Sequence, residues 1–170
     1  MRQKCLGILI QVQRENTVAT KDYSNKQESL IANYLGWERV SASGARDCHP
    51  GDIKSEEWIG ECKTHTKPIK EIRFVYAQWH KICEEAMTSR RFPVMFVDNG
   101  TQAISGTWCM VREFQVSHEP VEYIKSDKST LVLRADDFVK YQELGIGCLG
   151  YNFHGEKVVV MPISEYKKRI

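Results

Sequence analysis

Two acidic residues and a lysine, Asp52, Glu61 and Lys63, have types and spacing that suit the hydrolysis of a phosphodiester. This chemistry needs a divalent cation that neutralises the charge building up on the phosphate, and such a cation prefers oxygen ligands. Because side chains two apart on a strand emerge from the same face, Glu61 and Lys63 would lie side by side while Cys62 points the other way. Asp52 follows a proline-glycine turn, so a hairpin would place its carboxylate opposite Glu61.

Each of these groups has an expected role in such a site. Asp52, Glu61 and the backbone carbonyl of Cys62 would hold Mg²⁺ or Mn²⁺. Lys63 would lie near the metal, where its charge can orient an attacking water and help to deprotonate it, or can stabilise the phosphate in the transition state. The competing interpretation is an ordinary surface hairpin on which opposite charges pair.

The arrangement of Pro50-Gly51-Asp52 followed by Glu61-Cys62-Lys63 resembles the PD-(D/E)xK nuclease superfamily and, within it, archaeal and phage Holliday-junction resolvases. The likeness covers about residues 26–98, which would form the catalytic core. It implies an α/β, restriction-endonuclease-like fold in which a mixed central sheet is flanked by helices, here with a β-rich C-terminal extension. The chain departs from the family pattern at Gly51, which separates a proline and an aspartate that are usually adjacent.

The resemblance also implies further site residues. In the family, a glutamate on the first helix joins the metal site, and Glu28 is the matching position. Gln78, on the helix after the motif, matches a polar position that related nucleases place near the active centre. The loop before the metal aspartate often carries small residues that contact DNA, and their counterparts here are Ser41, Ser43 and Gly44.

Basic side chains around the motif are candidates for contacts with the DNA backbone. Lys67, Lys70 and Arg73 are spaced three apart at the start of a predicted helix, and Arg46 lies in the loop before Asp52. The alternative is a solvated helix face that acidic neighbours partly neutralise. Because the net charge is only +2, the local placement of charge has to carry the expectation of a polyanionic partner.

The elements that must position these residues are predicted from hydrophobic periodicity and turn residues. In chain order they are a helix (26–36), a strand (37–42), a loop (43–51), a hairpin (52–53 with 58–63), a helix (68–89), a central strand beside the hairpin (93–97), two strands (107–111 and 130–133), a helix (136–144) and a strand (157–161). This alternation predicts a sheet with helices packed on it.

Length and composition predict one nuclease domain over residues 1–170. A chain of 170 residues with 42% hydrophobic content can bury one core but hardly two. Its apolar runs are too short to span a bilayer, so we expect a soluble protein without a membrane partner. Six scattered cysteines favour buried, reduced thiols over disulfides or a zinc site, which indicates a cytoplasmic location. The resemblance implies a prokaryotic or phage-infected cell.

The expected function is endonucleolytic cleavage of DNA that depends on Mg²⁺ or Mn²⁺. By resemblance, the preferred substrate is branched DNA such as a Holliday junction, and a symmetric homodimer would cut two strands at paired positions. One alternative is another nuclease of the same superfamily that acts on flap, single-stranded or duplex DNA. A second alternative is a non-catalytic module that binds DNA or protein, because a fold alone does not fix a function.

Overall fold

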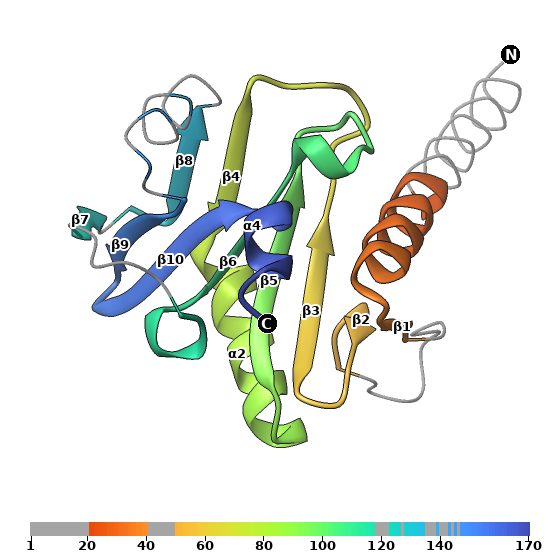
Figure 1. Ribbon diagram of the computed structural model, residues 1–170, viewed down its shortest axis with the longest axis horizontal. Coiled ribbons are helices and arrows are strands. Elements are labelled where there is room, and N and C mark those ends of the chain that lie inside the picture. The colour runs from red at the N-terminus through yellow and green to blue at the C-terminus, as the bar shows by residue number, and fades with distance from the viewer. Residues whose placement is uncertain are drawn as a thin grey trace, which may run out of the picture.

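The computed structural model describes residues 21–40, 50–117, 123–126, 128–134, 139, 143, 145 and 147–170. Within these ranges, eight strands form one sheet in the order β1-β2-β3-β5-β6-β10-β9-β7, and β4 pairs with β8 beside it (Figure 1). The first helix covers residues 21–35 of the described chain. The other elements are β1 (Glu38–Arg39), β2 (Ile53–Lys54), β3 (Trp58–Lys63), β4 (Glu71–Val75), α2 (Tyr76–Ser89), β5 (Phe92–Asp98), η1 (Ile104–Gly106), β6 (Thr107–Arg112), η2 (Glu113–Gln115), β7 (Tyr123–Ser126), β8 (Thr130–Arg134), β9 (Leu149–Phe153), β10 (Glu156–Pro162) and α4 (Ile163–Lys167).

The middle of the sheet consists of strands that are buried on both faces. β3 and β5 run parallel, with Glu61 beside Met95 and Cys62 beside Phe96. Every residue of β5 except Phe92 is buried. A near-continuous apolar run of this kind is typical of a strand that is covered from both sides. The predicted central strand beside the hairpin is confirmed.

Helices cover both faces of this sheet. On one face, α2 contributes Trp79 and Ile82 to a core that also includes side chains of β4 and β8. On the other face, the first helix packs through Ile31 and α4 packs through Tyr166. In Figure 1, α4 lies in front of the sheet and α2 lies behind it. The predicted mixed sheet flanked by helices is therefore confirmed as a mixed α/β fold.

The acid-bearing hairpin forms where the sequence predicts it, whereas the first helix, predicted from residue 26, already includes residues 21–25. The helix ends at Gly36, whose φ of +75° lies in the left-handed region that favours glycine after a helix. β2 and β3 are antiparallel, with Ile53 opposite Gly60. A Cβ at Gly60 would come within 2.9 Å of both Ile53 and Phe96, so the missing side chain lets the hairpin pack closely on the sheet. Of the predicted strand 37–42 only β1 is formed among the described residues, and the predicted loop falls mainly on residues 41–49, outside them.

The prediction of one long helix over residues 68–89 is wrong in its first part. Residues 71–75 form strand β4, and α2 begins only at Tyr76. Ile72 and Phe74 are buried while Arg73 between them is exposed, which is the alternation of a half-buried strand. Ile72 pairs with Leu133 of β8, far along the chain. This distant partner supplies the hydrogen bonds that make an extended conformation preferable here.

The strands of the last third continue the central sheet. β6, β8 and β10 confirm the strands predicted near residues 107–111, 130–133 and 157–161. The β-rich extension is not a separate layer, because β10 lies between β6 and β9 in the sheet. The helix predicted over 136–144 falls mainly outside the described residues. Within this range only residues 139 and 143 are described, and both are helical. Strands β7 and β9 and the helix α4 were not predicted.

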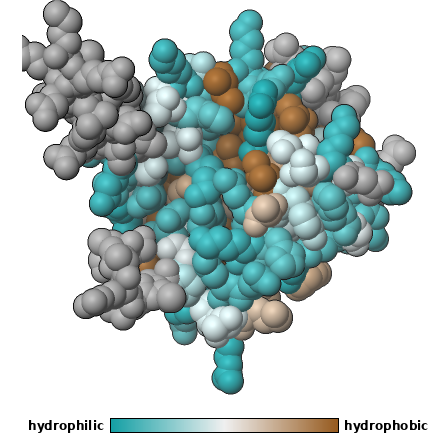
Figure 2. Space-filling model, turned by 180° about the vertical axis from the view of Figure 1, so that it is seen from behind, coloured by the Kyte–Doolittle hydropathy of each residue, from teal (hydrophilic) through white to brown (hydrophobic). Residues whose placement is uncertain are grey.

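The side of the molecule that carries α2 is largely hydrophilic at its surface. Figure 2 shows it from behind the view of Figure 1, and the most conspicuous group of hydrophobic residues at the surface lies near the upper middle. None of the helices within the described ranges is both long and apolar enough to cross a bilayer.

Candidate active site

The β2–β3 hairpin brings Asp52 to the strand that carries Glu61. The Asp52 N–H donates to the carbonyl of Gly60 over 2.8 Å. In return, the N–H of Cys62 donates to Asp52 Oδ2 over 2.7 Å. This pair of hydrogen bonds fixes both the backbone and the carboxylate of Asp52 against β3. The extra Gly51 before the aspartate therefore does not move it away from the motif.

Glu61 and Lys63 lie on one face of β3, as the spacing predicts. The Lys63 ammonium pairs with Glu61 Oε1 at 2.5 Å. Glu61 is buried, with 7% of its surface exposed, whereas the Lys63 side chain is 37% exposed. Cys62 points the other way, into the core under the first helix and α4. The hairpin thus presents a buried carboxylate and a solvent-accessible ammonium next to each other.

Burial and a neighbouring charge disfavour the ionised form of Asp52. Burial, followed by the Glu61 carboxylate, raises the pKa of Asp52 to about 6. The Cys62 hydrogen bond and the Lys63 ammonium oppose this shift, and Glu28 adds to it. Two carboxylates that repel each other in a partly buried environment would favour the binding of a cation between them.

The Cys62 carbonyl also faces the Asp52 side of β3. In an extended strand the N–H and C=O of one residue point to the same edge, and the Cys62 N–H points to Asp52. β2 ends its pairing at Ile53 opposite Gly60, so the carbonyl lies beyond the paired part of the hairpin. Of the oxygens predicted as metal ligands, the Asp52 carboxylate and the Cys62 carbonyl therefore lie at the same edge of β3.

Glu28 approaches this site but is engaged elsewhere. Its Oε2 lies 2.7 Å from Nη2 of Arg39, and its side chain is 15% exposed. Its charge reaches Asp52, because Glu28 contributes to the raised pKa of that residue. Among the described residues, no group of three or more histidine, cysteine, aspartate or glutamate side chains is placed to hold a metal ion. Glu28 is therefore paired to Arg39 and is not joined to the other oxygens that were predicted as metal ligands.

Helix α2 lies across from the hairpin and supplies two charged residues that were not predicted. Glu85 Oε2 accepts a hydrogen bond of 2.9 Å from the N–H of Gly51. Lys81 pairs with Glu85 Oε1 at 3.3 Å. The Glu61 carboxylate, ahead of Glu85 and Asp52, raises the pKa of Lys81. The predicted site residue Gln78 is half-buried near the start of α2. Lys81 lies three positions later, and this helical spacing could have indicated that Lys81 is on the same side of the helix.

Gln27 of the first helix is a further contact that was not predicted. It is fully buried, and its Nε2 donates to the backbone carbonyl of Lys63 over 2.9 Å. Its Oε1 is buried without a hydrogen-bond partner in the described part of the chain. Gln27 precedes the buried Ile31 by one helical turn, so the apolar stripe of the helix points it inward. It joins the first helix to the end of β3.

The segment after Lys63 is fastened by the buried carboxylate of Asp98. Asp98 Oδ2 accepts hydrogen bonds from the Thr64 hydroxyl at 2.9 Å and from the N–H groups of Gly100 and Gln102 at 3.0 Å. These bonds satisfy a carboxylate that is 0% exposed. They hold the end of β3 against the loop after β5, and so fix the place where Lys63 leaves the sheet.

The structure does not assemble the predicted basic helix face. Lys67 and Lys70 are exposed in the connection between β3 and β4, not on a helix. Arg73 lies on β4 and pairs with Glu71 at 2.8 Å, so its charge is partly neutralised. The prediction failed because the helix begins at Tyr76, after all three cations. Ser41, Ser43, Gly44 and Arg46 lie outside the described residues.

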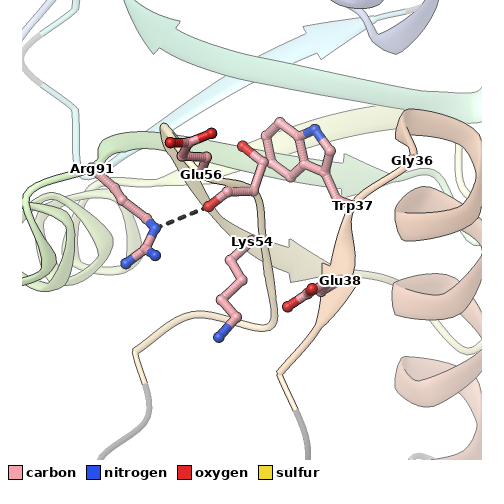
Figure 3. Close-up of a pocket in the computed structure, with 7 residues that line it drawn as sticks. Gly36, Trp37, Glu38, Lys54, Glu56 and Arg91 are labelled. Carbon is pink, nitrogen blue, oxygen red and sulfur yellow. Dashed lines mark hydrogen bonds between the residues drawn. The ribbon is translucent and has the colours of Figure 1, made fainter.

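A separate hollow of about 380 Å³ lies at the other end of the hairpin (Figure 3). It is lined by Gly36, Trp37, Glu38, Lys54, Ser55, Glu56 and Arg91. The Arg91 guanidinium donates from Nε to the Ser55 carbonyl over 3.0 Å, as the dashed line shows. Its mixed charges and its position at the β2–β3 turn separate it from the carboxylate site.

Comparison of the chain with protein-family models finds no matching family, and comparison with curated proteins finds no match.

Proposed function

We propose that this chain is a DNA endonuclease that depends on Mg²⁺ or Mn²⁺, has a restriction-endonuclease-like fold and prefers branched DNA such as a four-way junction. The observation that carries the proposal is that the Asp52 carboxylate accepts the Cys62 N–H of β3, the strand on which Glu61 pairs with the Lys63 ammonium at 2.5 Å. An acid pair of this kind suits a hard divalent cation, and an adjacent ammonium suits a phosphate substrate.

The metal would be held by Asp52, Glu61 and the carbonyl of Cys62. The raised pKa of Asp52, which is due first to burial and then to the charge of Glu61, supports this ligand set. When bound, the ion would neutralise charge that develops on the phosphate during cleavage. Lys63, which is 37% exposed in its side chain, can reach solvent and would hold and polarise the attacking water or stabilise the phosphate.

The direct test is cleavage of a labelled four-way junction by variants that remove one acid charge. Asp52→Asn or Glu61→Gln should abolish Mg²⁺-dependent cutting while leaving binding of the junction largely intact. Glu84→Gln is the matched control, because Glu84 is a solvent-exposed acid on α2 that pairs only weakly with His80, at 3.7 Å. Undiminished cutting by either site variant would refute the proposal.

The proposed preference for branched DNA can be tested separately from cleavage itself. Side-by-side digestion of four-way, flap, single-stranded and linear duplex DNA should show the fastest cutting on the junction. Faster cutting of a flap or of linear duplex would retain the nuclease and assign it a different substrate.

Two observations favour a second candidate, a non-catalytic DNA-binding module. Glu28 pairs with Arg39, and no three-acid metal cluster is formed by the described residues. If wild-type protein binds DNA but nicks none of the four substrates at any concentration of Mg²⁺ or Mn²⁺, the binding module becomes the better account.

A further inference from the structure

The turn that delivers Asp52 is fastened to helix α2 as well as to β3. The Gly51 N–H donates to Glu85 Oε2 over 2.9 Å. Gly51 has a φ of +70°, and a Cβ there would come within 2.5 Å of Ile59 Cγ1, so the turn lies tightly against β3. Because Asp52 comes next in the chain, Glu85 helps to set where its carboxylate stands.

The same glutamate pairs with a lysine of α2. Glu85 Oε1 lies 3.3 Å from Nζ of Lys81, one helical turn earlier. The Lys81 side chain is 63% exposed, so its ammonium can be reached from solvent. Because the other oxygen of Glu85 accepts the Gly51 N–H at 2.9 Å, one carboxylate links the Lys81 ammonium to the residue that precedes Asp52.

We propose that Lys81 contacts the phosphate of the nucleic acid bound at the carboxylate site, and that Glu85 is the positioning residue that locates both Lys81 and the Asp52 turn. The inference rests on the proposed function and names a further binding residue for it. Lys63 already pairs with Glu61 within hydrogen-bond distance. Lys81 pairs with Glu85 at the longer distance of 3.3 Å, and 63% of its side chain is exposed, so a phosphodiester can reach its ammonium.

A purely structural role predicts a different outcome. Exposed lysine-glutamate pairs one helical turn apart contribute little to stability. If Lys81 served only to stabilise α2, its removal would leave DNA affinity unchanged. Lys168 offers a matched control, because it also forms an exposed ion pair within one helical turn, at 2.6 Å from Glu165 on α4.

The first experiment measures the affinity of the full chain for a fluorescent four-way junction in Ca²⁺ at several salt concentrations. Lys81→Ala should weaken binding about five- to tenfold and lower the salt slope by about one, whereas Lys168→Ala should change neither. Lys81→Arg, which keeps the charge, should restore most of the affinity. Equal affinity and slope for Lys81→Ala and Lys168→Ala overturn the assignment of Lys81.

The second experiment measures Mn²⁺ binding to the DNA-free protein by calorimetry. Glu85→Ala should weaken Mn²⁺ binding several-fold because the Asp52 turn loses its anchor, while Glu85→Gln, which still accepts the Gly51 hydrogen bond, should retain it. Melting curves confirm that both variants are folded. Equal Mn²⁺ affinity of Glu85→Ala and Glu84→Ala overturns the positioning role.

The two proposals fail in distinguishable ways. If wild-type protein cuts DNA and the Lys81 and Glu85 variants behave as their controls do, the inference fails and the nuclease stands. If wild-type protein binds neither Mn²⁺ nor the junction, the proposed function fails and the inference is overturned with it.

Discussion

At the scale of one residue, the ionised carboxylate of Asp52 lowers the folding stability of the metal-free protein. Its pKa is raised from 3.8 to about 6, chiefly by burial and then by Glu61. Folding therefore favours the protonated carboxyl, and the ionised form destabilises the metal-free protein. This penalty is fully present above about pH 6 and disappears as the pH falls below about 4. A bound cation would remove it at neutral pH.

Replacing Asp52 with asparagine should therefore stabilise the metal-free protein at pH 7.5, by about 2 kcal/mol. Asparagine keeps an oxygen that can accept the Cys62 hydrogen bond and carries no charge for Glu61 to repel. Urea denaturation at pH 7.5 and pH 4, in the presence of a chelator, measures the effect. The gain should shrink towards zero at pH 4, and a variant less stable than wild type at pH 7.5 would contradict this assignment.

Removing the Lys63 ammonium should slow cleavage about a hundredfold or more without preventing metal binding. Lys63→Met keeps the length of the side chain and leaves Glu61 without its partner at 2.5 Å. Single-turnover rates on the junction, together with Mn²⁺ titration, measure the two effects separately, with Lys168→Met as the control. A rate equal to that of the control would remove Lys63 from the mechanism.

The residues of the hairpin could be predicted because their relation is local. Glu61 and Lys63 share a face through the two-residue period of a strand, and Asp52 meets them across one turn. Gln27 and Glu85 reach the site only through the packing of helices on the two faces of the sheet. No spacing along the chain specifies that packing, so these contacts were not predicted.

At the scale of elements, the same contrast explains which strands were predicted. β5 has an apolar run that only a covered strand accommodates, and it was predicted. In β4, Ile72 fits both a helical stripe and a two-residue alternation, and the partner that decides between them is β8. The pairing of distant strands is a property of the whole fold. The predicted helix therefore begins too early in the chain, and the basic helix face predicted on its first turns is wrong for the same reason.

Gln27 joins the first helix to β3. The free energy of unfolding should fall more when a charge is placed at Gln27 than when its amide is removed. Gln27→Leu removes the hydrogen bond to the Lys63 carbonyl but also removes a buried oxygen without a partner, so its net effect should be within about 1 kcal/mol of zero. Gln27→Glu buries a charge at a fully buried position and should destabilise by about 3 kcal/mol at neutral pH. Urea denaturation of both variants at pH 7.5 tests this order, which a more stable glutamate variant would reverse.

At the scale of the whole molecule, one strand and two helices pack around β3 and support the site. β5 pairs with β3 along its length, α2 covers the face that Glu61 and Lys63 share, and the first helix contacts the end of β3 from the other face. Such support from packed elements is what holds a pair of carboxylates in one geometry. The proposed preference for four-way junctions also carries a consequence for assembly.

A junction-cutting enzyme of this design should be a homodimer, because paired cuts need two sites related by symmetry. Sedimentation equilibrium with and without junction DNA should give twice the mass of the chain, at least in the complex. A monomer in both conditions would contradict the preference for junctions and leave cleavage of other DNA as the function to test.

The most direct measurement of the central claim is the number of Mn²⁺ ions that the DNA-free protein binds. Calorimetry or electron paramagnetic resonance should find one ion per wild-type chain at neutral pH, with binding lost or greatly weakened in both Asp52→Asn and Glu61→Gln and retained in Glu84→Gln. Equal Mn²⁺ binding by wild-type protein and the two site variants would show that Asp52 and Glu61 do not share a metal ion, and the proposed cleavage site would have to be abandoned.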